Sequence, residues 1–232
     1  MITTNILYRM FFVHGEQYGS AFALDRDKRQ YLVTARHIVG SDRARDSISI
    51  YLEKSWKALG VKVVGLGNGD IDVAVLSPAQ QIAPNFPLEA AIGSFILGQD
   101  MLIVGYPLKM SSDGGAVTSG RPVPFVRKGV LSAFDWDTDP KTLWIDAVNN
   151  EGFSGGPILF QNMQSPLPAP ALYLVAGVVS KYKVVDEPVL DAKLEPTGMC
   201  VQIHAGFTMG CAIKHVLDLI DSNPIGFVLP PE

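Results

Sequence analysis

The stretch of the sequence best suited to chemistry is residues 152–157, Gly-Phe-Ser-Gly-Gly-Pro, in which Ser154 stands among three glycines. Glycine accepts backbone angles that other residues avoid, so the main chain can turn sharply here and approach a ligand closely. A serine on such a turn can expose its hydroxyl, and neighbouring backbone N–H groups can face a developing negative charge. The stretch predicts a nucleophilic serine, although a tight turn entering a strand would use the same residues.

A serine hydroxyl is a poor nucleophile at neutral pH and needs a general base, usually a histidine that a carboxylate orients. Of the four histidines, His37 stands where a predicted buried strand turns into a short connection, so that a rigid core could hold it facing a groove. Asp72 directly precedes the apolar run 73–76, where an ionised carboxylate is costly unless it has a partner. Asp70 has the same parity along this segment, so alternation leaves both carboxylates open.

Three blocks together resemble the signature blocks of the trypsin/chymotrypsin-fold serine proteases: residues 34–37 (TARH), 72–76 (DVAVL) and 152–157 (GFSGGP). The order His, Asp, Ser is also the order in that family. Details such as residues 145–152 resemble the bacterial HtrA/Deg branch, and the likeness extends over about residues 19–220. The resemblance selects Asp72 over Asp70, because the family's aspartate is followed by an apolar residue, Ala, an apolar residue and Leu.

This resemblance implies that His37, Asp72 and Ser154 are the catalytic residues, acting as general base, orienting carboxylate and nucleophile. It implies that the backbone N–H groups of Gly152 and Ser154 form the oxyanion hole. Residues 177–182 resemble the family's strand that pairs with the substrate backbone, to which an extended peptide would add as another strand. The implied reaction is endopeptidase hydrolysis through an acyl-enzyme, with no metal and no organic cofactor.

The expected substrate-binding residues are Val148, Ser180, Lys181 and Tyr182. Val148 stands six positions before Ser154, where an acid would favour Lys or Arg in the S1 pocket. We therefore expect a preference for small or medium apolar side chains, with Tyr182 narrowing the pocket.

The sequence departs from the family pattern in three places. Phe153 stands where relatives carry Asp or Asn, so the loop before Ser154 must be ordered in another way. Arg36 replaces the usual small residue before the histidine. No PDZ-like region follows residue 224, so the peptide-sensing module of typical HtrA proteins is expected to be missing.

The elements that must position these residues are many short strands separated by turns, with one amphipathic helix near the end, a pattern that predicts an all-β barrel or sandwich. The resemblance sharpens this to two six-stranded antiparallel β-barrels of chymotrypsin-like fold with a C-terminal α-helix. The expected domains are residues 1–95, carrying His37 and Asp72, and residues 96–232, carrying Ser154 and the helix 212–222.

Two further segments read as long loops, residues 108–124 and 183–198, and residues 164–170 read as a proline-rich excursion. Long ordered loops in compact domains are usually functional. We expect the two long loops to hold the site partly disordered until a substrate or an activating partner protein orders it.

Composition excludes several classes of protein. Apolar residues make up 47% of the 232 residues and charged residues 18%, which indicates a globular chain. A formal net charge of −4 without a Lys/Arg run argues against nucleic-acid binding, and the longest apolar stretches are too short to cross a membrane. No secretory signal is visible, so we expect a cytoplasmic protein. Cys200 and Cys211 are expected to be buried thiols or a single bridge.

Two alternatives remain open on the sequence. Residues 152–156 also satisfy the G-x-S-x-G pattern of α/β-hydrolase esterases, whose triad would combine Ser154 with Asp191 and either His204 or His215, although the following Gly-Gly-Pro opposes the helix which that fold requires. The other alternative is a catalytically silent protease-like module that binds or regulates, which Phe153 and the missing sensor module make credible.

Overall fold

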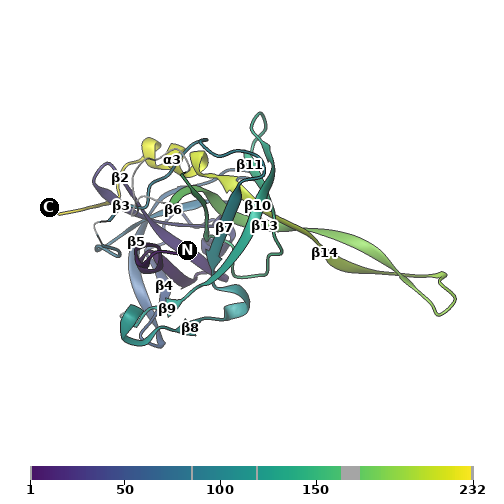
Figure 1. Cartoon of the computed structure of the whole chain (residues 1–232). Coiled ribbons are helices and arrows are strands. Elements are labelled where there is room, and N and C mark those ends of the chain that lie inside the picture. Colours follow the sequence, from purple (N-terminus) through teal and green to yellow (C-terminus); the bar gives the residue numbers. More distant parts are fainter. Residues whose placement is uncertain (1, 85, 119, 163–172, 231–232) are drawn as a thin grey trace.

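The protein is described here by a computed structural model that covers residues 2–84, 86–118, 120–162 and 173–230; the proline-rich stretch 164–170 lies outside these ranges. Most of the chain forms antiparallel strands that build two sheets, each closed on itself (Figure 1). The predicted all-β fold with two barrels and a C-terminal helix is confirmed. None of the helices in the described ranges is long and apolar enough to cross a lipid bilayer.

The N-terminal sheet has the strand order β15-β3-β2-β1-β4-β5-β6, and β6 also pairs with β3, which closes the sheet. Its runs of buried Val, Ile, Leu, Ala and Phe suit strands that face a packed interior. The strands are β1 (Met10–His14), β2 (Tyr18–Arg26), β3 (Arg29–Thr34), β4 (Ser47–Leu52), β5 (Ser55–Leu66), β6 (Ala74–Pro78) and β15 (Phe227–Val228). A short helix, α1 (Thr4–Tyr8), precedes β1 and occupies part of an apolar run that strand patterning alone would assign to a strand.

The second sheet is a closed six-stranded barrel with the order β10-β11-β14-β13-β12-β7. Its strands are β7 (Asp100–Gly105), β10 (Phe125–Asp135), β11 (Thr142–Asp146), β12 (Pro157–Gln161), β13 (Tyr173–Leu190) and β14 (Pro196–Ala212). Helix α3 (Ile213–Ser222) follows β14 directly and buries Ile213, Val216, Leu217 and Ile220.

One apolar core joins the two barrels. Phe22 and Val33 of the first sheet, Val104 and Leu159 of the second, and Val216 of α3 belong to a single cluster of buried side chains. Beyond α3 the chain returns to the N-terminal sheet, where Phe227 pairs with Gln30 of β3. The division at residues 95 and 96 remains a prediction, and the structure adds that the last strand belongs to the first sheet.

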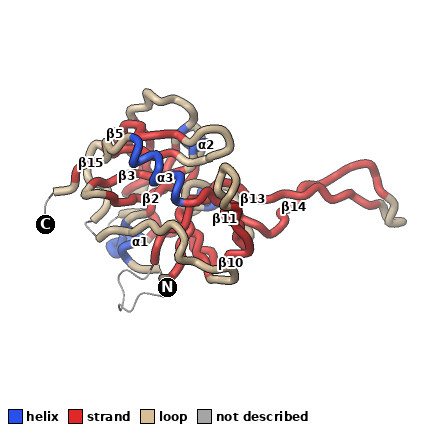
Figure 2. The backbone as a smooth tube through the Cα atoms, turned by 90° about the horizontal axis from the view of Figure 1, so that it is seen from above, coloured by secondary structure: helices blue, strands red, loops and turns tan. Residues whose placement is uncertain are grey.

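The prediction of a loop over residues 183–198 is wrong. Strands β13 and β14 continue beyond the barrel as a two-stranded ribbon, residues 183–204, which stands clear of the body in two perpendicular views (Figures 1 and 2). Its cross-strand register runs from Val184 opposite His204 to Leu190 opposite Pro196. Both faces of the ribbon are exposed, so no alternation between buried and exposed residues marks it in the sequence.

Residues 108–124 contain short ordered elements: the 3-10 helices η1 (Pro107–Lys109) and η2 (Gly115–Thr118) and the hairpin of β8 (Ser112–Asp113) with β9 (Pro122–Val123). Two contacts fix this segment to the body. The Tyr106 hydroxyl donates a hydrogen bond to the Pro122 carbonyl at 3.0 Å, and Arg121 donates to the Ile82 carbonyl at 2.9 Å.

The two cysteines are free thiols, Cys211 buried and Cys200 exposed, so the expectation of two buried thiols is wrong for Cys200. Both lie on β14, eleven residues apart (211 − 200 = 11). A strand rises roughly 3.3 Å per residue. The two sulfurs are therefore much too far apart for a disulfide within the chain.

Candidate active site

His37 and Asp72 meet because the strands that carry them are paired. Thr34, the last residue of β3, lies opposite Ala74, the first residue of β6. His37 follows Thr34 on the one-turn helix α2 (Arg36–Val39), and Asp72 precedes Ala74. The His37 ring nitrogen Nδ1 lies 2.8 Å from Asp72 Oδ2, and the backbone N–H of His37 donates to Asp72 Oδ1 at 3.0 Å. Both carboxylate oxygens thus hold the histidine.

Asp72 accepts a third hydrogen bond, from Ser180, which sequence reasoning missed. The Ser180 hydroxyl of β13 donates to Asp72 Oδ2 at 2.8 Å. Burial by itself raises the pKa of Asp72, but the hydrogen bonds and charge of His37, with the Ser180 hydroxyl, outweigh it and hold the pKa below its ordinary value. A carboxylate that accepts several hydrogen bonds is favoured in its charged form. Asp72 is therefore an ionised partner for the imidazole at neutral pH.

Arg36, a departure from the family pattern, has a defined role in the structure. Its guanidinium donates to the carbonyl oxygens of Gly67 at 2.6 Å and Gly69 at 2.7 Å. These carbonyls belong to the turn that leads to Asp72. Arg36 therefore stabilises the turn that carries the carboxylate, next to the histidine that the carboxylate holds.

The loop around Ser154 depends on two glycines with positive φ. Gly152 has φ +98° and Gly155 has φ +82°, the left-handed region that favours glycine. There is also no room for a side chain at either position: a Cβ would lie 2.2 Å from the Tyr106 carbonyl oxygen at Gly152 and 2.1 Å from the Ser20 carbonyl oxygen at Gly155. The glycine cluster therefore serves backbone conformation and close packing together.

Ser20 of β2 connects the first barrel to this loop, and sequence reasoning missed it. Its hydroxyl donates to the Gly152 carbonyl at 2.6 Å and accepts from the Tyr106 N–H at 3.0 Å. Its backbone N–H donates to the Ser154 carbonyl at 2.9 Å. Ser20 is completely buried among the apolar residues of β2. A hydroxyl inside a buried apolar run needs partners, and that is the signal which could have revealed it.

Phe153 orders the nucleophile loop by burial. The side chain is fully buried and belongs to the core cluster of the second barrel. An apolar anchor thus stands directly before Ser154.

The peptide group between Glu151 and Gly152 has a fixed orientation. The Leu108 N–H donates to the Glu151 carbonyl at 2.7 Å. In a trans peptide the N–H points opposite to the C=O, so the Gly152 N–H points away from Leu108. In the described part of the chain, no backbone hydrogen bond occupies the N–H of Gly152 or of Ser154.

The Ser154 hydroxyl donates to the Ser180 carbonyl at 3.0 Å. His37, Asp72 and Ser154 all line one groove of about 920 Å³ between the two barrels, together with Gly152 and residues 180–182. The structure thus brings together every predicted site residue except Val148, which is 48% exposed and does not line this groove.

The other histidines have different surroundings. The two ring nitrogens of His204 face the backbone N–H groups of Asn149 and Gly206, at 3.1 and 2.8 Å. His215 is buried on α3, and its Nε2 accepts from the Lys141 N–H at 2.9 Å. Asp191 lies at the far end of the ribbon. The esterase alternative is wrong, because the fold is all-β and its triad residues are dispersed.

The described residues contain no group of three His, Cys, Asp or Glu side chains placed to hold a metal ion. The side chains that the structure does assemble in the groove are a hydroxyl, an imidazole and a carboxylate, which is a set suited to nucleophilic catalysis.

Comparison with known proteins agrees with this geometry. A family model described as a trypsin-like peptidase domain matches residues 19–164. Among curated proteins, a sequence search finds no match.

Solved structures with the same fold include a serine endoprotease from Yersinia pestis, with a TM-score of 0.57, 17% identity, and coverage of 96% of this chain and 66% of that one. They also include an inactive form of the Rv3671c protease of M. tuberculosis (TM-score 0.56, 16% identity, 94% and 90% coverage). A third is the HtrA-type protease AlgW with a tripeptide (TM-score 0.56, 17% identity, 94% and 61% coverage). The chain thus spans less than two thirds of the length of the Yersinia and AlgW structures.

Proposed function

The chain belongs to the family of trypsin-like peptidase domains, and from this premise we propose that it is a serine endopeptidase with His37, Asp72 and Ser154 as its catalytic residues. The observation that carries the proposal is the hydrogen-bonded pair of His37 and Asp72 in one groove with Ser154, supplied by opposite barrels. Protein or peptide substrates follow from the family.

Asp72 determines which nitrogen of His37 is free to act. Because Nδ1 faces Asp72 Oδ2 at 2.8 Å, Nε2 is the nitrogen available for proton transfer. In the proposed reaction Ser154 Oγ attacks the peptide carbonyl while His37 Nε2 takes its proton, and His37 then gives that proton to the leaving amine. Water, activated by the same nitrogen, releases the acyl group and restores the Ser154 hydroxyl.

The negative charge on the attacked carbonyl oxygen needs donors. We assign this role to the backbone N–H groups of Gly152 and Ser154, which no backbone hydrogen bond occupies within the described residues. Preorganised donors of this kind supply about 2.7–4 kcal/mol each to the stabilisation of such a transition state. The Leu108 contact to Glu151 supports this role, because it fixes the peptide group that presents the Gly152 N–H.

Substrate binding is proposed to release the nucleophile. The Ser180 carbonyl, which accepts the Ser154 hydroxyl at 3.0 Å, is also the acceptor that a peptide N–H would use when the substrate adds as a strand along residues 180–182. The substrate N–H would displace the hydroxyl, and rotation about the Ser154 Cα–Cβ bond would then turn it toward His37. An activating partner that acts on residues 108–124 remains a prediction.

The predicted preference for small or medium apolar P1 residues also remains a proposal. Tyr182 supports it, because its ring lies on the groove wall and stacks on His204 at a centroid distance of 4.9 Å. Cleavage of a peptide library with varied P1 residues tests the preference, and efficient cleavage after Lys or Arg alone would contradict it.

A fluorophosphonate probe tests the catalytic assignment. We expect covalent labelling at Ser154, complete loss of labelling in Ser154→Ala, and slower labelling by a factor of about 10³ or more in His37→Ala and Asp72→Asn. Ser132→Ala and His14→Ala are matched controls away from the His37–Asp72 pair. Peptidase activity that survives Ser154→Ala would refute the assignment.

One observation favours a second candidate function, a silent protease-like module. The Ser154 hydroxyl is bonded to a carbonyl oxygen and not to the imidazole. A module of this kind would bind peptide in the groove without labelling by the probe, and without hydrolysis of any library member.

A further inference from the structure

The ribbon is continuous with the strand that forms one wall of the groove. On one edge, β13 pairs with β12 from Tyr173 to Val178. At Val179 the same edge is closed by the nucleophile loop, since the Gly155 N–H donates to the Val179 carbonyl at 2.7 Å and the Val179 N–H donates to the Gly156 carbonyl at 2.9 Å. Beyond Ser180, no strand of the described chain pairs with this edge, while β14 pairs with the other edge as far as Leu190.

We propose that the free edge of β13 from Lys181 to Glu187 is an extended binding site for the part of a polypeptide substrate that lies upstream of the cleaved bond. The proposal rests on the proposed function and deepens it. The substrate segment adds as an antiparallel strand that starts at Ser180 and runs outward along the ribbon. An exposed edge offers the backbone N–H and C=O groups that such an added strand requires.

The charges along the edge define the chemistry of the preferred substrate. In an antiparallel pair, one substrate residue stands opposite each residue of β13. The register of β13 against β14 shifts between Val179 and Lys181 and again between Tyr182 and Val184. A one-to-one count along β13 from Ser180, opposite the cleaved residue, places Asp186 at the sixth residue upstream (186 − 180 = 6) and Glu187 at the seventh. Both carboxylates are exposed, and no ion pair occupies either within the described chain. Lys or Arg at these two substrate positions is therefore favoured.

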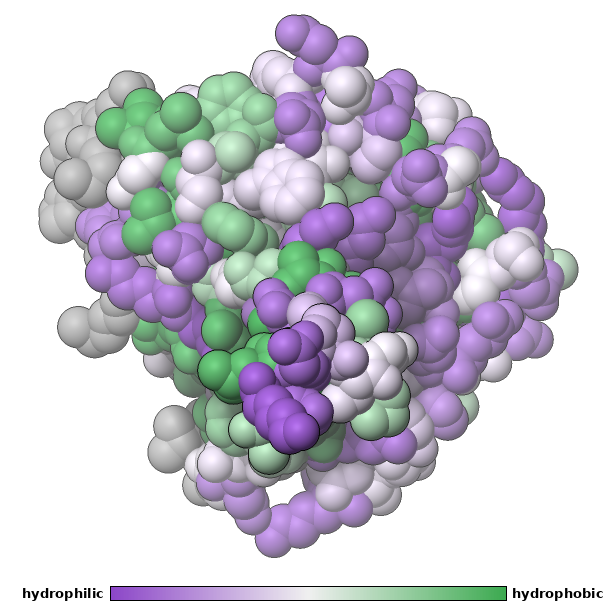
Figure 3. Space-filling model, turned by 90° about the vertical axis from the view of Figure 1, so that its right-hand side faces the viewer, coloured by the Kyte–Doolittle hydropathy of each residue, from purple (hydrophilic) through white to green (hydrophobic). Residues whose placement is uncertain are grey.

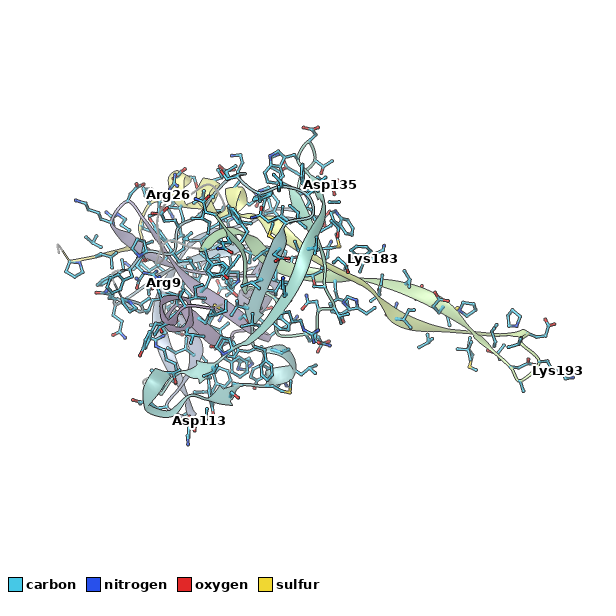
Figure 4. The ribbon with its side chains drawn as sticks, in the orientation of Figure 1. Arg9, Arg26, Asp113, Asp135, Lys183 and Lys193 are labelled. Atoms are coloured by element: carbon cyan, nitrogen blue, oxygen red, sulfur yellow. The ribbon has the colours of Figure 1, made fainter. Side chains whose placement is uncertain are left out.

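The inner part of the edge has the opposite charge. Lys181 and Lys183 precede the two carboxylates on the same strand, and Lys183 lies where the ribbon leaves the body (Figure 4). Basic substrate residues are therefore disfavoured close to the cleaved bond and favoured farther upstream. Pro188 ends the binding edge, because proline has no N–H to donate to an added strand.

The other surfaces of the ribbon fit this use less well. Viewed toward the tip, hydrophobic side chains gather along one side of the ribbon (Figure 3). The outer edge, on β14, is uncharged from Thr197 to Ala205 and is the edge that a second copy of the chain could pair with. Only the β13 edge is continuous with the groove that holds Ser154, and continuity with that groove selects a substrate segment as the occupant.

Three internally quenched peptides test the proposal. All three share one cleavable segment of about eight residues, and the short peptide consists of this segment alone. The other two extend about six residues further upstream. The Lys peptide carries Lys at the sixth and seventh upstream positions, and the Glu peptide carries Glu at both. We expect kcat/KM for the Lys peptide to exceed that for the short peptide about tenfold, from two exposed ion pairs and added backbone hydrogen bonds. The Glu peptide should gain much less.

Charge changes on the ribbon separate this site from a general effect of net charge. Asp186→Asn/Glu187→Gln should abolish the preference for Lys over Glu, and Asp186→Lys/Glu187→Lys should reverse it. Thr197→Lys/Met199→Lys adds the same net charge as the Asn/Gln variant, but at exposed β14 positions that do not stand opposite Asp186 or Glu187, and should keep the preference. Equal kcat/KM for all three peptides, or equal loss in the β14 control, would overturn the proposal.

Binding to Ser154→Ala distinguishes failure of this inference from failure of the proposed function. Fluorescence anisotropy with the three labelled peptides requires no catalysis, and the Lys peptide should again bind about tenfold more tightly than the short one. If the Lys peptide binds more tightly than the short peptide but the wild type cleaves neither, the proposed peptidase activity is refuted and the binding site on the β13 edge is supported. If the wild type shows no preference among the peptides and the β14 variant changes the oligomeric state, the ribbon instead binds a second copy of the chain.

Discussion

The guanidinium of Arg127 lies 5.6 Å from the ring centroid of Phe153, the residue directly before the nucleophile candidate Ser154. Arg127 also donates to Asn150 Oδ1 at 2.7 Å, so one side chain contacts both ends of the turn that approaches Ser154. Phe153 itself is fully buried. The buried ring of Phe153 and the Arg127 guanidinium beside it thus order this loop, because Phe153 has no charge with which to form an ion pair.

Phe153→Ala should lower the free energy of unfolding by about 3–5 kcal/mol, because it leaves a cavity in the second barrel. It should also reduce the rate of fluorophosphonate labelling at Ser154 under conditions in which the protein is still folded. Urea unfolding and labelling kinetics measure the two effects. Phe125→Ala removes an exposed ring and serves as the control. Unchanged labelling in folded Phe153→Ala would show that the loop does not depend on this anchor.

Ser20→Ala should affect catalysis more than its cost in stability suggests. The change leaves the Gly152 carbonyl and the Tyr106 N–H without their hydroxyl partner, at a cost of about 1–3 kcal/mol. Because Gly152 carries a proposed oxyanion donor, we expect kcat to fall while KM changes little. Ser77→Ala is the matched control, since that buried hydroxyl donates to the Ile225 carbonyl away from the groove. Equal loss of kcat in both variants would contradict a specific role for Ser20.

Ser180→Ala removes the hydroxyl that donates to Asp72 and keeps the backbone carbonyl that faces Ser154. A hydrogen bond to a charged group contributes about 1.5–3 kcal/mol, so we expect kcat/KM to fall at least about tenfold. A double-mutant cycle with Asp72→Asn checks the cause, because the two losses should not add if the hydroxyl acts through Asp72. Full additivity would assign Ser180 a role independent of the carboxylate.

His215 makes stability depend on pH. Burial lowers the pKa of its imidazole, and in the unfolded chain that pKa is about 6.5. The unfolded chain therefore takes up the proton more readily than the folded one. The stabilisation from neutral His215 is fully present above about pH 6.5 and is lost as the pH falls through the lower folded value.

Thermal unfolding between pH 8 and pH 5 measures this loss. His215→Gln should make the midpoint temperature depend less steeply on pH, even though it lowers the midpoint at pH 8. Burial also lowers the pKa of His204, so this histidine affects stability in the same direction. The double variant His204→Gln/His215→Gln should therefore show the weakest dependence of the midpoint temperature on pH. A curve as steep as that of the wild type in the double variant would contradict this account.

The sequence located the side chains that line the groove better than it located the contacts that hold them in place. Residue types and spacing single out Ser154 in its glycine cluster and His37 at a strand end, whereas the family resemblance was needed to select Asp72 over Asp70. Ser20 and the Ser180 hydroxyl were missed, because their partners lie far away in the sequence and only the closing of two barrels against each other brings them into contact.

The same distinction holds for the fold. Strands that bury one face leave a pattern in the sequence, and these were predicted. The ribbon buries neither face, and its acidic residues with Pro188 are typical of a loop, so nothing in residues 183–198 distinguishes a projecting hairpin. The ribbon forms because the backbones of β13 and β14 pair, and the pattern of side chains in the sequence does not reveal such pairing.

Ser20 and its partner Gly152 are 132 positions apart in the chain, so they are synthesised at different times. Ribosomes add roughly 5–20 residues per second, so about 7–26 s separate the synthesis of these two partners. His37 and Asp72 are both made before Ser154, and over the 82 positions from Asp72 to Ser154 (154 − 72 = 82) the imidazole and its carboxylate have no hydroxyl to activate. If the chain is the peptidase proposed here, the order of synthesis delays its activity at least until Ser154 has been added and the second barrel, which includes β14, can close.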